Sequence, residues 1–193
     1  MKKIKSLFKK NYDTRLAYNE INKEAEWVLS GKGWATEKFD GTACMIKDGL
    51  FYKRYDRKLI KSKKNPNNVS YKPAPDKWIA CERLPDPITG HWPGWCLVTD
   101  KPEDQYHREA FREKFRDGTY ELVGPKIQGN PYGLDKHYLF KHGGNIIFDV
   151  PRDFEGLKQY FSIHIIEGIV WHRKNGDMIK IKRKDFGYEW PDI

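Results

Sequence analysis

Short runs of alternating apolar and polar residues recur along the chain, a pattern typical of β-strands rather than of long helices. Two pairs of such runs are each joined by a dipeptide that favours a tight turn, Asp48-Gly49 in one pair and Asn175-Gly176 in the other. The paired runs are residues 42–47 with 50–55, and residues 167–172 with 178–182. Each pair therefore predicts an antiparallel hairpin.

Helical spacing of apolar residues is limited to three segments. Residues 14–30 carry apolar side chains close to helical spacing, and Gly31 stands where such a helix should end. Residues 103–117 and residues 151–161 predict two further helices. The sequence also predicts two polar segments. We expect residues 1–12 to form a basic N-terminal arm and residues 61–77 to form a loop.

The composition indicates a packed, basic protein. Of the 193 residues, 38% are apolar and 15% are aromatic, which is typical of a chain with a core rather than of a disordered one. Lysine and arginine number 36 against 27 acidic residues, and the net charge of +9 favours a polyanionic partner such as nucleic acid. A basic protein without such a partner has the same charge balance.

Cysteine usage and hydropathy bear on where the chain resides. The three cysteines, Cys44, Cys81 and Cys96, show no CxxC spacing, and their odd number indicates a reducing compartment. The basic start lacks the apolar run of a signal peptide, and no segment is long and apolar enough to span a membrane. We therefore expect a cytoplasmic location without membrane contact.

The first candidate for chemistry is Lys38, which opens the sequence Lys38-Phe39-Asp40-Gly41 between two strand-like runs. A lysine at a tight turn between strands is held on rigid elements, as a nucleophilic lysine must be. The alternative is an exposed lysine that precedes an ordinary Asp-Gly turn.

Further charged residues stand in strand-like segments. Glu121 stands inside an apolar strand and Glu167 at the head of one, and a carboxylate in a strand core requires a partner, a hydrated cavity or a metal. The alternative for Glu167 is that it lies at the strand end, in water. Lys180 and Lys182 must share one face of their strand, which suits an anion, although lysines also protect edge strands. With Lys38, this set suits attack by an amine on a nucleotide α-phosphate.

Five short motifs together resemble those of the covalent nucleotidyltransferases, which comprise ATP-dependent RNA and DNA ligases and mRNA capping enzymes. EKFDG resembles their KxDG motif, YKR with Arg54 resembles the following arginine motif, and TYELVG with Glu121 resembles the third. EGIV with Glu167 and IKIK with Lys180 and Lys182 resemble the fourth and fifth. The five occur in the family's order, so the joint match is far more specific than any one motif.

The resemblance is closer to RNA ligases, and closest to the 5′–3′ RNA ligase family of vertebrates and some viruses. YELVGPKIQGNPYG is similar to a stretch of phage-type RNA ligases that precedes an adenine-stacking aromatic residue, which by this similarity would be Phe140. KPAPDKWIA, HWPGW, GNPYGL and EGIVWH look like segments of the vertebrate and viral family. The likeness extends from Trp34 to Trp190.

This resemblance implies a single adenylation domain over residues 1–193. The implied fold is an α+β nucleotidyltransferase fold, in which antiparallel sheets with flanking helices surround a nucleotide cleft. Because little of the chain follows Lys182, we expect no OB domain.

The resemblance also implies the reaction. Lys38 would attack ATP to give lysyl-AMP, the AMP would pass to an RNA 5′-phosphate, and a 3′-hydroxyl would displace it to seal the strand. Mg²⁺ or Mn²⁺ would assist, with Glu121 and Glu167 as metal ligands. The implied nucleotide-binding residues are Glu37, Arg54, Glu121, Phe140, Glu167, Lys180 and Lys182.

The expected partner is RNA with 5′-phosphate and 3′-hydroxyl ends, in RNA repair and without an obligate protein partner. Arg57, Lys61, Lys63 and Lys64 are the candidate RNA-binding residues, although a solvated loop explains the lysines equally well, and Arg57 could take the place of Arg54. The alternatives are a GTP-dependent, capping-type guanylyltransferase and a non-catalytic basic RNA-binding module.

Overall fold

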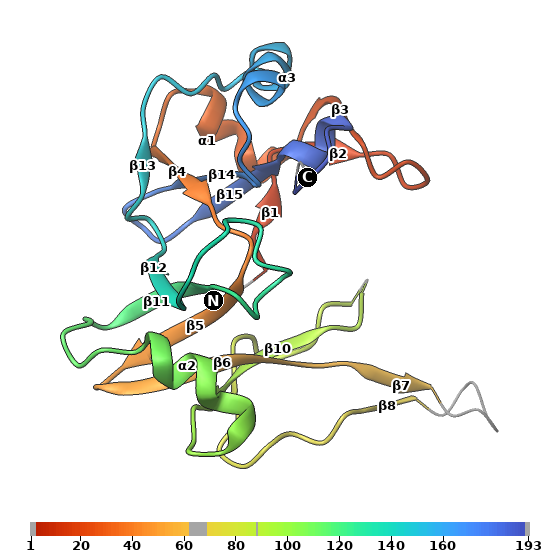
Figure 1. Ribbon diagram of the computed structural model, residues 1–193. Coiled ribbons are helices and arrows are strands. Elements are labelled where there is room, and N and C mark those ends of the chain that lie inside the picture. Colours follow the sequence, from red (N-terminus) through yellow and green to blue (C-terminus); the bar gives the residue numbers. More distant parts are fainter. Residues whose placement is uncertain (1–2, 62–68, 88, 192–193) are drawn as a thin grey trace. The chain divides into compact units, whose positions relative to one another are not determined.

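The computed structural model describes residues 3–61, 69–87 and 89–191 (Figure 1). Contacts within the chain divide it into two compact units, each with its own core. The terminal unit combines Ile4–Asp40 with Phe140–Ile193, and the central unit comprises Lys3 and Gly41–Leu139. The single adenylation domain stays a prediction.

A five-stranded sheet forms the terminal unit, with its strands in the order β1, β15, β14, β4, β13. Strands β1 and β15 are parallel, whereas the other neighbours are antiparallel. Strands β2 and β3 form a separate two-stranded sheet. The bounds are Lys5–Ser6 (β1), Phe8–Lys10 (β2), Ala17–Ile21 (β3), Trp34–Lys38 (β4), Ile146–Ile147 (β13), Gly168–His172 (β14) and Met178–Lys182 (β15).

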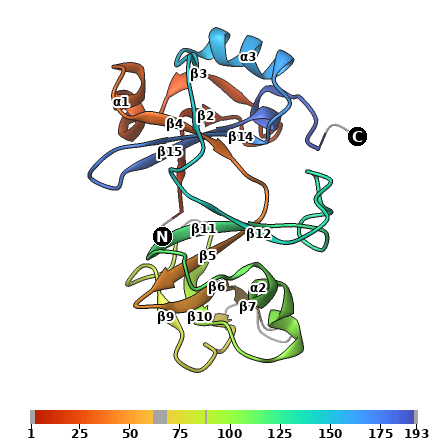
Figure 2. The same cartoon turned by 60° about the vertical axis from the view of Figure 1, so that its left-hand side comes forward.

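Two α-helices, α1 (Glu26–Leu29) and α3 (Phe154–Ile163), lie on the same side of this sheet (Figure 1, Figure 2). Helix α3 begins where the Asp153 carboxylate accepts a hydrogen bond from the Gly156 amide, a typical N-cap. Two 3₁₀ turns complete the unit, η1 (Lys23–Ala25) and η3 (Arg183–Phe186).

Alternation along β14 and β15 separates a core face of the sheet from a polar face. The core face packs with Leu157 and Phe161 of α3 in one buried cluster. The residues that the two strands contribute to this cluster are Ile169, Trp171, Ile179 and Ile181. Because successive side chains of a strand point to opposite faces, Lys180 and Lys182 lie on the polar face.

A six-stranded sheet with the order β12, β11, β5, β6, β10, β9 forms the central unit, together with the β7–β8 hairpin. Its core contains Cys44, Ile46 and Leu122, packed against Ala110 of helix α2. The bounds are Thr42–Lys47 (β5), Leu50–Arg57 (β6), Leu59–Lys61 (β7), Val69–Tyr71 (β8), Ile79–Ala80 (β9), Trp92–Leu97 (β10), Pro102–Asp104 (η2), Gln105–Ala110 (α2), Gly118–Val123 (β11) and Tyr138–Lys141 (β12).

Both hairpins predicted from the sequence are confirmed. Strands β5 and β6 are paired antiparallel, as are β14 and β15. Asp48 and Gly49 have φ angles of 53° and 72°, the left-handed backbone that a two-residue hairpin turn of this kind requires. The described residues thus form mixed sheets with few helices, and none of these helices is long and apolar enough to cross a membrane.

The helix predicted over residues 14–30 is wrong in its first half. Ala17–Ile21 form strand β3, in which Ile21 lies opposite Phe8 of β2, and helical structure begins only at Lys23. The apolar spacing that suggested a helix serves a strand here, because β2 supplies a partner that is distant in the sequence.

The segment predicted as a basic arm is folded where it is described. Leu7 and Phe8 are buried in the core of the terminal unit, between strands β1 and β2. The segment is rich in lysine but also contains these two core residues, so its composition alone did not predict that it is folded.

The other predicted helices are shorter than expected. Helix α2 ends at Ala110, and Phe111 already has an extended backbone with φ −73° and ψ 142°. Helix α3 begins at Phe154 rather than at residue 151, because Asp153 forms its cap.

Arg183 generates a stability prediction. Its buried guanidinium donates hydrogen bonds to the carbonyl oxygens of Glu189, Phe161 and His164. Arg183→Met should lower the free energy of unfolding by about 2–4 kcal/mol, because three carbonyl groups lose a charged donor.

The neighbouring Lys184 is exposed and provides the matched control, since Lys184→Met should change the free energy of unfolding by less than about 0.5 kcal/mol. Urea denaturation of both variants makes the comparison. Equal stability of the two would show that the Arg183 contacts contribute nothing.

Candidate functional site

Lys38 is the last residue of β4 and lies in a row across three strands. It is opposite Gly168 of β14, and Gly168 is opposite Lys182 of β15. A Cβ atom at Gly168 would come within 2.4 Å of the Ile181 carbonyl oxygen, so glycine is needed between the two lysines. The sheet register therefore places Lys38 and Lys182 on either side of β14.

The Glu167 carboxylate joins these two lysines. Its Oε2 accepts a hydrogen bond from Nζ of Lys38, and its Oε1 accepts one from Nζ of Lys182. Glu167 is only 2% exposed, whereas the Lys38 and Lys182 side chains are 17% and 20% exposed. A carboxylate buried this deeply requires such partners. The sequence prediction that Glu167 needs a partner is thereby confirmed.

Lys180 adds a third ammonium group on the same face. Burial, and then the positive charges of Lys182, Lys38 and Lys10, lower its pKa to about 8, against a smaller opposing effect of Glu167. None of the described side chains forms an ion pair with Lys180. Three lysines thus surround one carboxylate, and an anion would relieve their mutual repulsion.

His172 continues this face without adding charge. It is buried, and its Nε2 lies 2.9 Å from Oγ1 of Thr36. Burial and the nearby His142 lower the pKa of His172 to about 4, so the ring is neutral at pH 7. The positive charge of the face therefore comes from its lysines.

A ring stack and a hydrogen bond hold the segment that follows Lys38. The Phe39 ring stacks on Phe140 with a centroid distance of 4.2 Å and an interplanar angle of 8°. The Asp40 carboxylate accepts a hydrogen bond of 3.0 Å from Nε1 of Trp190. One face of Phe140 is thus covered by Phe39, and its stacking on adenine stays a prediction.

Glu37 lies on the opposite face of β4 from Lys38. Its carboxylate accepts a hydrogen bond of 2.9 Å from Nδ2 of Asn145, and burial raises its pKa. The alternation of side chains explains this placement, and nucleotide binding by Glu37 stays a prediction.

Arg54 and Glu121 belong to the central unit. Arg54 donates to Asp56 at 2.7 Å, lies 3.6 Å from the Cys81 sulfur and packs over the Trp95 ring. Glu121 is opposite Ala43 in the sheet. The joint action of these two residues with Lys38 stays a prediction.

Arg57 is held by aromatic side chains within the central unit. Its guanidinium lies 4.8–5.7 Å from the centroids of the Tyr71, Trp78 and Trp92 rings, and its Nε donates to the Lys72 carbonyl oxygen. These contacts fix the side chain, and RNA binding by Arg57 stays a prediction.

The predicted loop at residues 61–77 is described except for residues 62–68. It is wrong at Val69–Tyr71, which form strand β8 paired with β7. Lys61 ends strand β7, whereas Lys63 and Lys64 lie outside the described residues. The predicted metal ligands, Glu121 and Glu167, belong to different units, and no cluster of three potential metal-binding side chains occurs among the described residues. Both sets of roles stay predictions.

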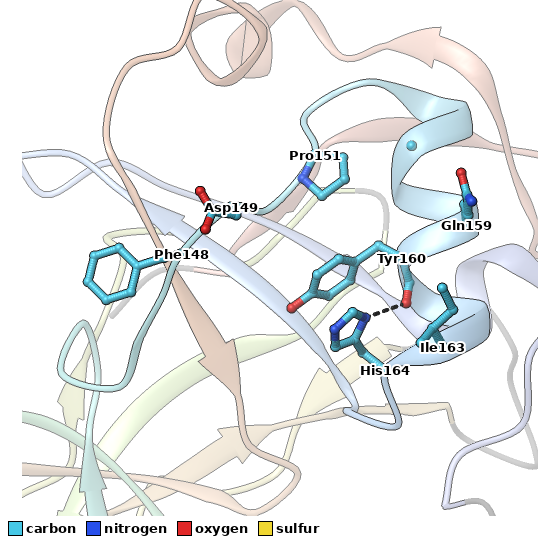
Figure 3. Close-up of a pocket in the computed structure, with 8 residues that line it drawn as sticks. Phe148, Asp149, Pro151, Gln159, Tyr160, Ile163 and His164 are labelled. Carbon is cyan, nitrogen blue, oxygen red and sulfur yellow. Dashed lines mark hydrogen bonds between the residues drawn. The ribbon is translucent and has the colours of Figure 1, made fainter.

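A separate cavity of about 380 Å³ lies beside α3 (Figure 3). The Tyr160 ring stacks on His164, whose Nδ1 lies 2.9 Å from the Tyr160 carbonyl oxygen. No lysine or arginine lines it, so the cavity lacks the positive charge that a polyphosphate requires. The lining residues are Phe148, Asp149, Pro151, Gly156, Gln159, Tyr160, Ile163 and His164.

Two contacts near Lys38 were missed in the sequence, the Phe39–Phe140 stack and the Trp190–Asp40 hydrogen bond, as was the effect of the Lys10 charge on Lys180. Each joins segments far apart in the chain, and periodicity carries no signal for such pairs. The paired spacing of Lys180 and Lys182 was a local signal, and it identified their common face.

Comparison with known proteins supports a ligase assignment. The family model for RNA ligase 1 matches residues 108–193. RNA ligase 1 of Rattus norvegicus is 30% identical, in an alignment that covers 81% of this chain and 68% of the relative. RNA ligase 1 of Danio rerio is also 30% identical, with the same coverage of both chains. The chain therefore belongs to the RNA ligase 1 family.

Proposed function

We propose that this chain is an ATP-dependent 5′–3′ RNA ligase that acts through lysyl-AMP and has a nucleotidyltransferase fold. The observation that carries the proposal is the pair of ammonium groups, Lys38 and Lys182, on the buried Glu167 carboxylate, with Lys180 beside them. In an RNA ligase family, this is the arrangement expected of a nucleophilic lysine in an anion-binding site.

In the first step, Nζ of Lys38, as the free amine, attacks the α-phosphorus of ATP. A nitrogen–phosphorus bond forms, and the bond from the α-phosphorus to the bridging oxygen breaks. Pyrophosphate leaves with that oxygen, and the proton that the Lys38 nitrogen loses passes to solvent. Glu167 orients the Lys38 nitrogen through the hydrogen bond already present. Lys180 and Lys182 offset the charge that develops on the α-phosphate oxygens.

In the second step, a 5′-phosphate oxygen of RNA attacks the same phosphorus, and Lys38 takes up a proton from solvent and leaves as the amine. An RNA 3′-hydroxyl then attacks the 5′-phosphate, which joins the strands and releases AMP. The net charge of +9 supports an RNA partner, because phosphate contacts dominate the affinity of proteins for nucleic acids.

The Glu167 carboxylate beside Lys38 suits Mg²⁺ or Mn²⁺ bound with the substrate. Magnesium sites for phosphoryl transfer commonly use one or two carboxylates, with substrate phosphates and water as the remaining ligands. We propose Glu167 and Glu121 as these carboxylates. The metal would neutralise phosphate charge.

The first prediction concerns a variant in which Lys38, the proposed nucleophile, is replaced by arginine, which has the same charge. Lys38→Arg keeps a cation against Glu167, so the fold should persist, but AMP attachment should fall by more than about a thousandfold. Intact mass after incubation with ATP and Mg²⁺ measures the adduct, and the exposed Lys47→Arg is the matched control.

The same assay with GTP in place of ATP separates the alternatives. Attachment of GMP instead of AMP would favour a capping-type guanylyltransferase, and no adduct with either nucleotide would favour a non-catalytic RNA-binding module. An AMP adduct on Lys38→Arg at the parent level would refute Lys38 as the nucleophile.

The second prediction concerns pH and ATP affinity. Lys180 is a cation below its pKa of about 8 and neutral above it, and bound phosphate favours the cation. In the Lys38→Arg variant, the Kd for ATP should therefore be constant below that pH and rise by up to about tenfold per pH unit above it.

Lys180→Met in the same background should bind ATP more weakly at low pH and lose this rise in Kd. Equilibrium titrations across the pH range measure both effects. The same pH dependence with and without Lys180 would show that another group is responsible.

A further inference from the structure

The N-terminal segment pairs with β15, the strand that carries Lys180 and Lys182. Strand β1 runs parallel to β15 with Ser6 opposite Lys180, and the two lie side by side in Figure 1. The Leu7 amide donates a hydrogen bond of 2.7 Å to the Lys180 carbonyl oxygen. Because Leu7 and Phe8 are buried, the residues that follow them have a defined position beside β15.

Lys10, at the end of β2, is the residue that this arrangement brings to the candidate site. Its Nζ donates a hydrogen bond of 2.6 Å to Oδ1 of the buried Asp185. Oδ2 of Asp185 accepts a hydrogen bond of 3.0 Å from the Lys182 amide. Lys10 is thus attached, through one carboxylate, to the backbone of a residue in the site.

The positive charge of Lys10 also acts on a residue of the candidate site, Lys180. It is among the positive charges that lower the pKa of Lys180. Its side chain is 32% exposed, so the ammonium group is partly accessible while Asp185 holds it. An ammonium group has three donor hydrogens, which leaves Lys10 able to bind a further acceptor.

The net charge of the groups around Lys180 indicates which anion they are suited to bind. Before the reaction, with Lys38 in its ion pair with Glu167, the cluster holds four ammonium groups and two carboxylates, an excess of two positive charges (4 − 2). The ammonium groups are those of Lys10, Lys38, Lys180 and Lys182, and the carboxylates are those of Glu167 and Asp185. The α-phosphate alone carries a single negative charge, whereas a nucleoside triphosphate with one bound Mg²⁺ keeps about two.

We propose that Lys10 binds the β- and γ-phosphates of the nucleoside triphosphate and so selects a triphosphate over a monophosphate. This inference rests on the proposed function, since it assigns a further binding residue to the same reaction. Lys180 and Lys182 hold the α-phosphate, and Lys10 donates to the part that leaves as pyrophosphate.

The test compares the affinities for ATP and AMP in the full chain carrying Lys38→Arg, which cannot form the adduct. Adding Lys10→Gln should weaken ATP binding by about tenfold and leave AMP binding unchanged, because AMP lacks the β- and γ-phosphates. Lys10→Arg should restore the preference for ATP. Lys9→Gln is the matched control, since Lys9 pairs with Glu20 on the surface.

Lys10→Gln leaves the Asp185 carboxylate without its ion pair and could lower stability. The double variant Lys10→Gln, Asp185→Asn removes both charges and keeps a hydrogen-bonding side chain at residue 185, so it should fold and show the same selective loss of ATP affinity. Equal weakening of ATP and AMP in the double variant, or no weakening of either, would overturn the proposal.

A second measurement distinguishes the leaving phosphates from an RNA phosphate. With Lys38 intact, Lys10→Gln should seal RNA that already carries a 5′-adenylate at the parent rate, because that reaction involves no pyrophosphate. Slower sealing of this substrate would overturn the assignment to the β- and γ-phosphates. If the chain without the Lys10 change binds neither ATP nor AMP, the proposed function itself fails, which is a distinct result.

Discussion

The buried Glu167 carboxylate is the interaction on which the candidate site depends. A carboxylate that is 2% exposed would be strongly destabilising alone, and each of its oxygens accepts a hydrogen bond from a lysine. Conversely, Lys38, Lys180 and Lys182 would repel one another without this acid. Glu167 therefore makes a cluster of cations compatible with the fold while leaving the cluster an excess of positive charge.

The strands that carry these charges also carry the core of the terminal unit. On β15, Ile179 and Ile181 are buried among core residues, whereas Lys180 and Lys182 face the site. A shift of one residue in strand register would exchange the two sets. Packing of the apolar face against α3 thus fixes where the lysines point, so one register determines both the core of the unit and the geometry of the candidate site.

Features that depend on residues close together in the sequence could be predicted, whereas contacts between residues far apart in the sequence could not. The turn dipeptides Asp48-Gly49 and Asn175-Gly176 marked both hairpins, and the spacing of Lys180 and Lys182 identified their common face. The Lys10–Asp185 contact joins residues 175 positions apart and leaves no periodic trace. The strand at Ala17–Ile21 was mistaken for a helix for the same reason, since its pairing partner β2 decides its conformation.

The central claim is that Lys38, among several neighbouring lysines, is the residue that carries AMP. Proteolytic digestion of the protein after reaction with ATP and Mg²⁺, followed by peptide mass spectrometry, locates the modified side chain directly. We expect AMP on Lys38 alone, because its amine is hydrogen-bonded to Glu167 as proposed for the nucleophile, whereas Lys180 and Lys182 are proposed to bind phosphate. AMP on Lys180 or Lys182, with Lys38 unmodified, would contradict it.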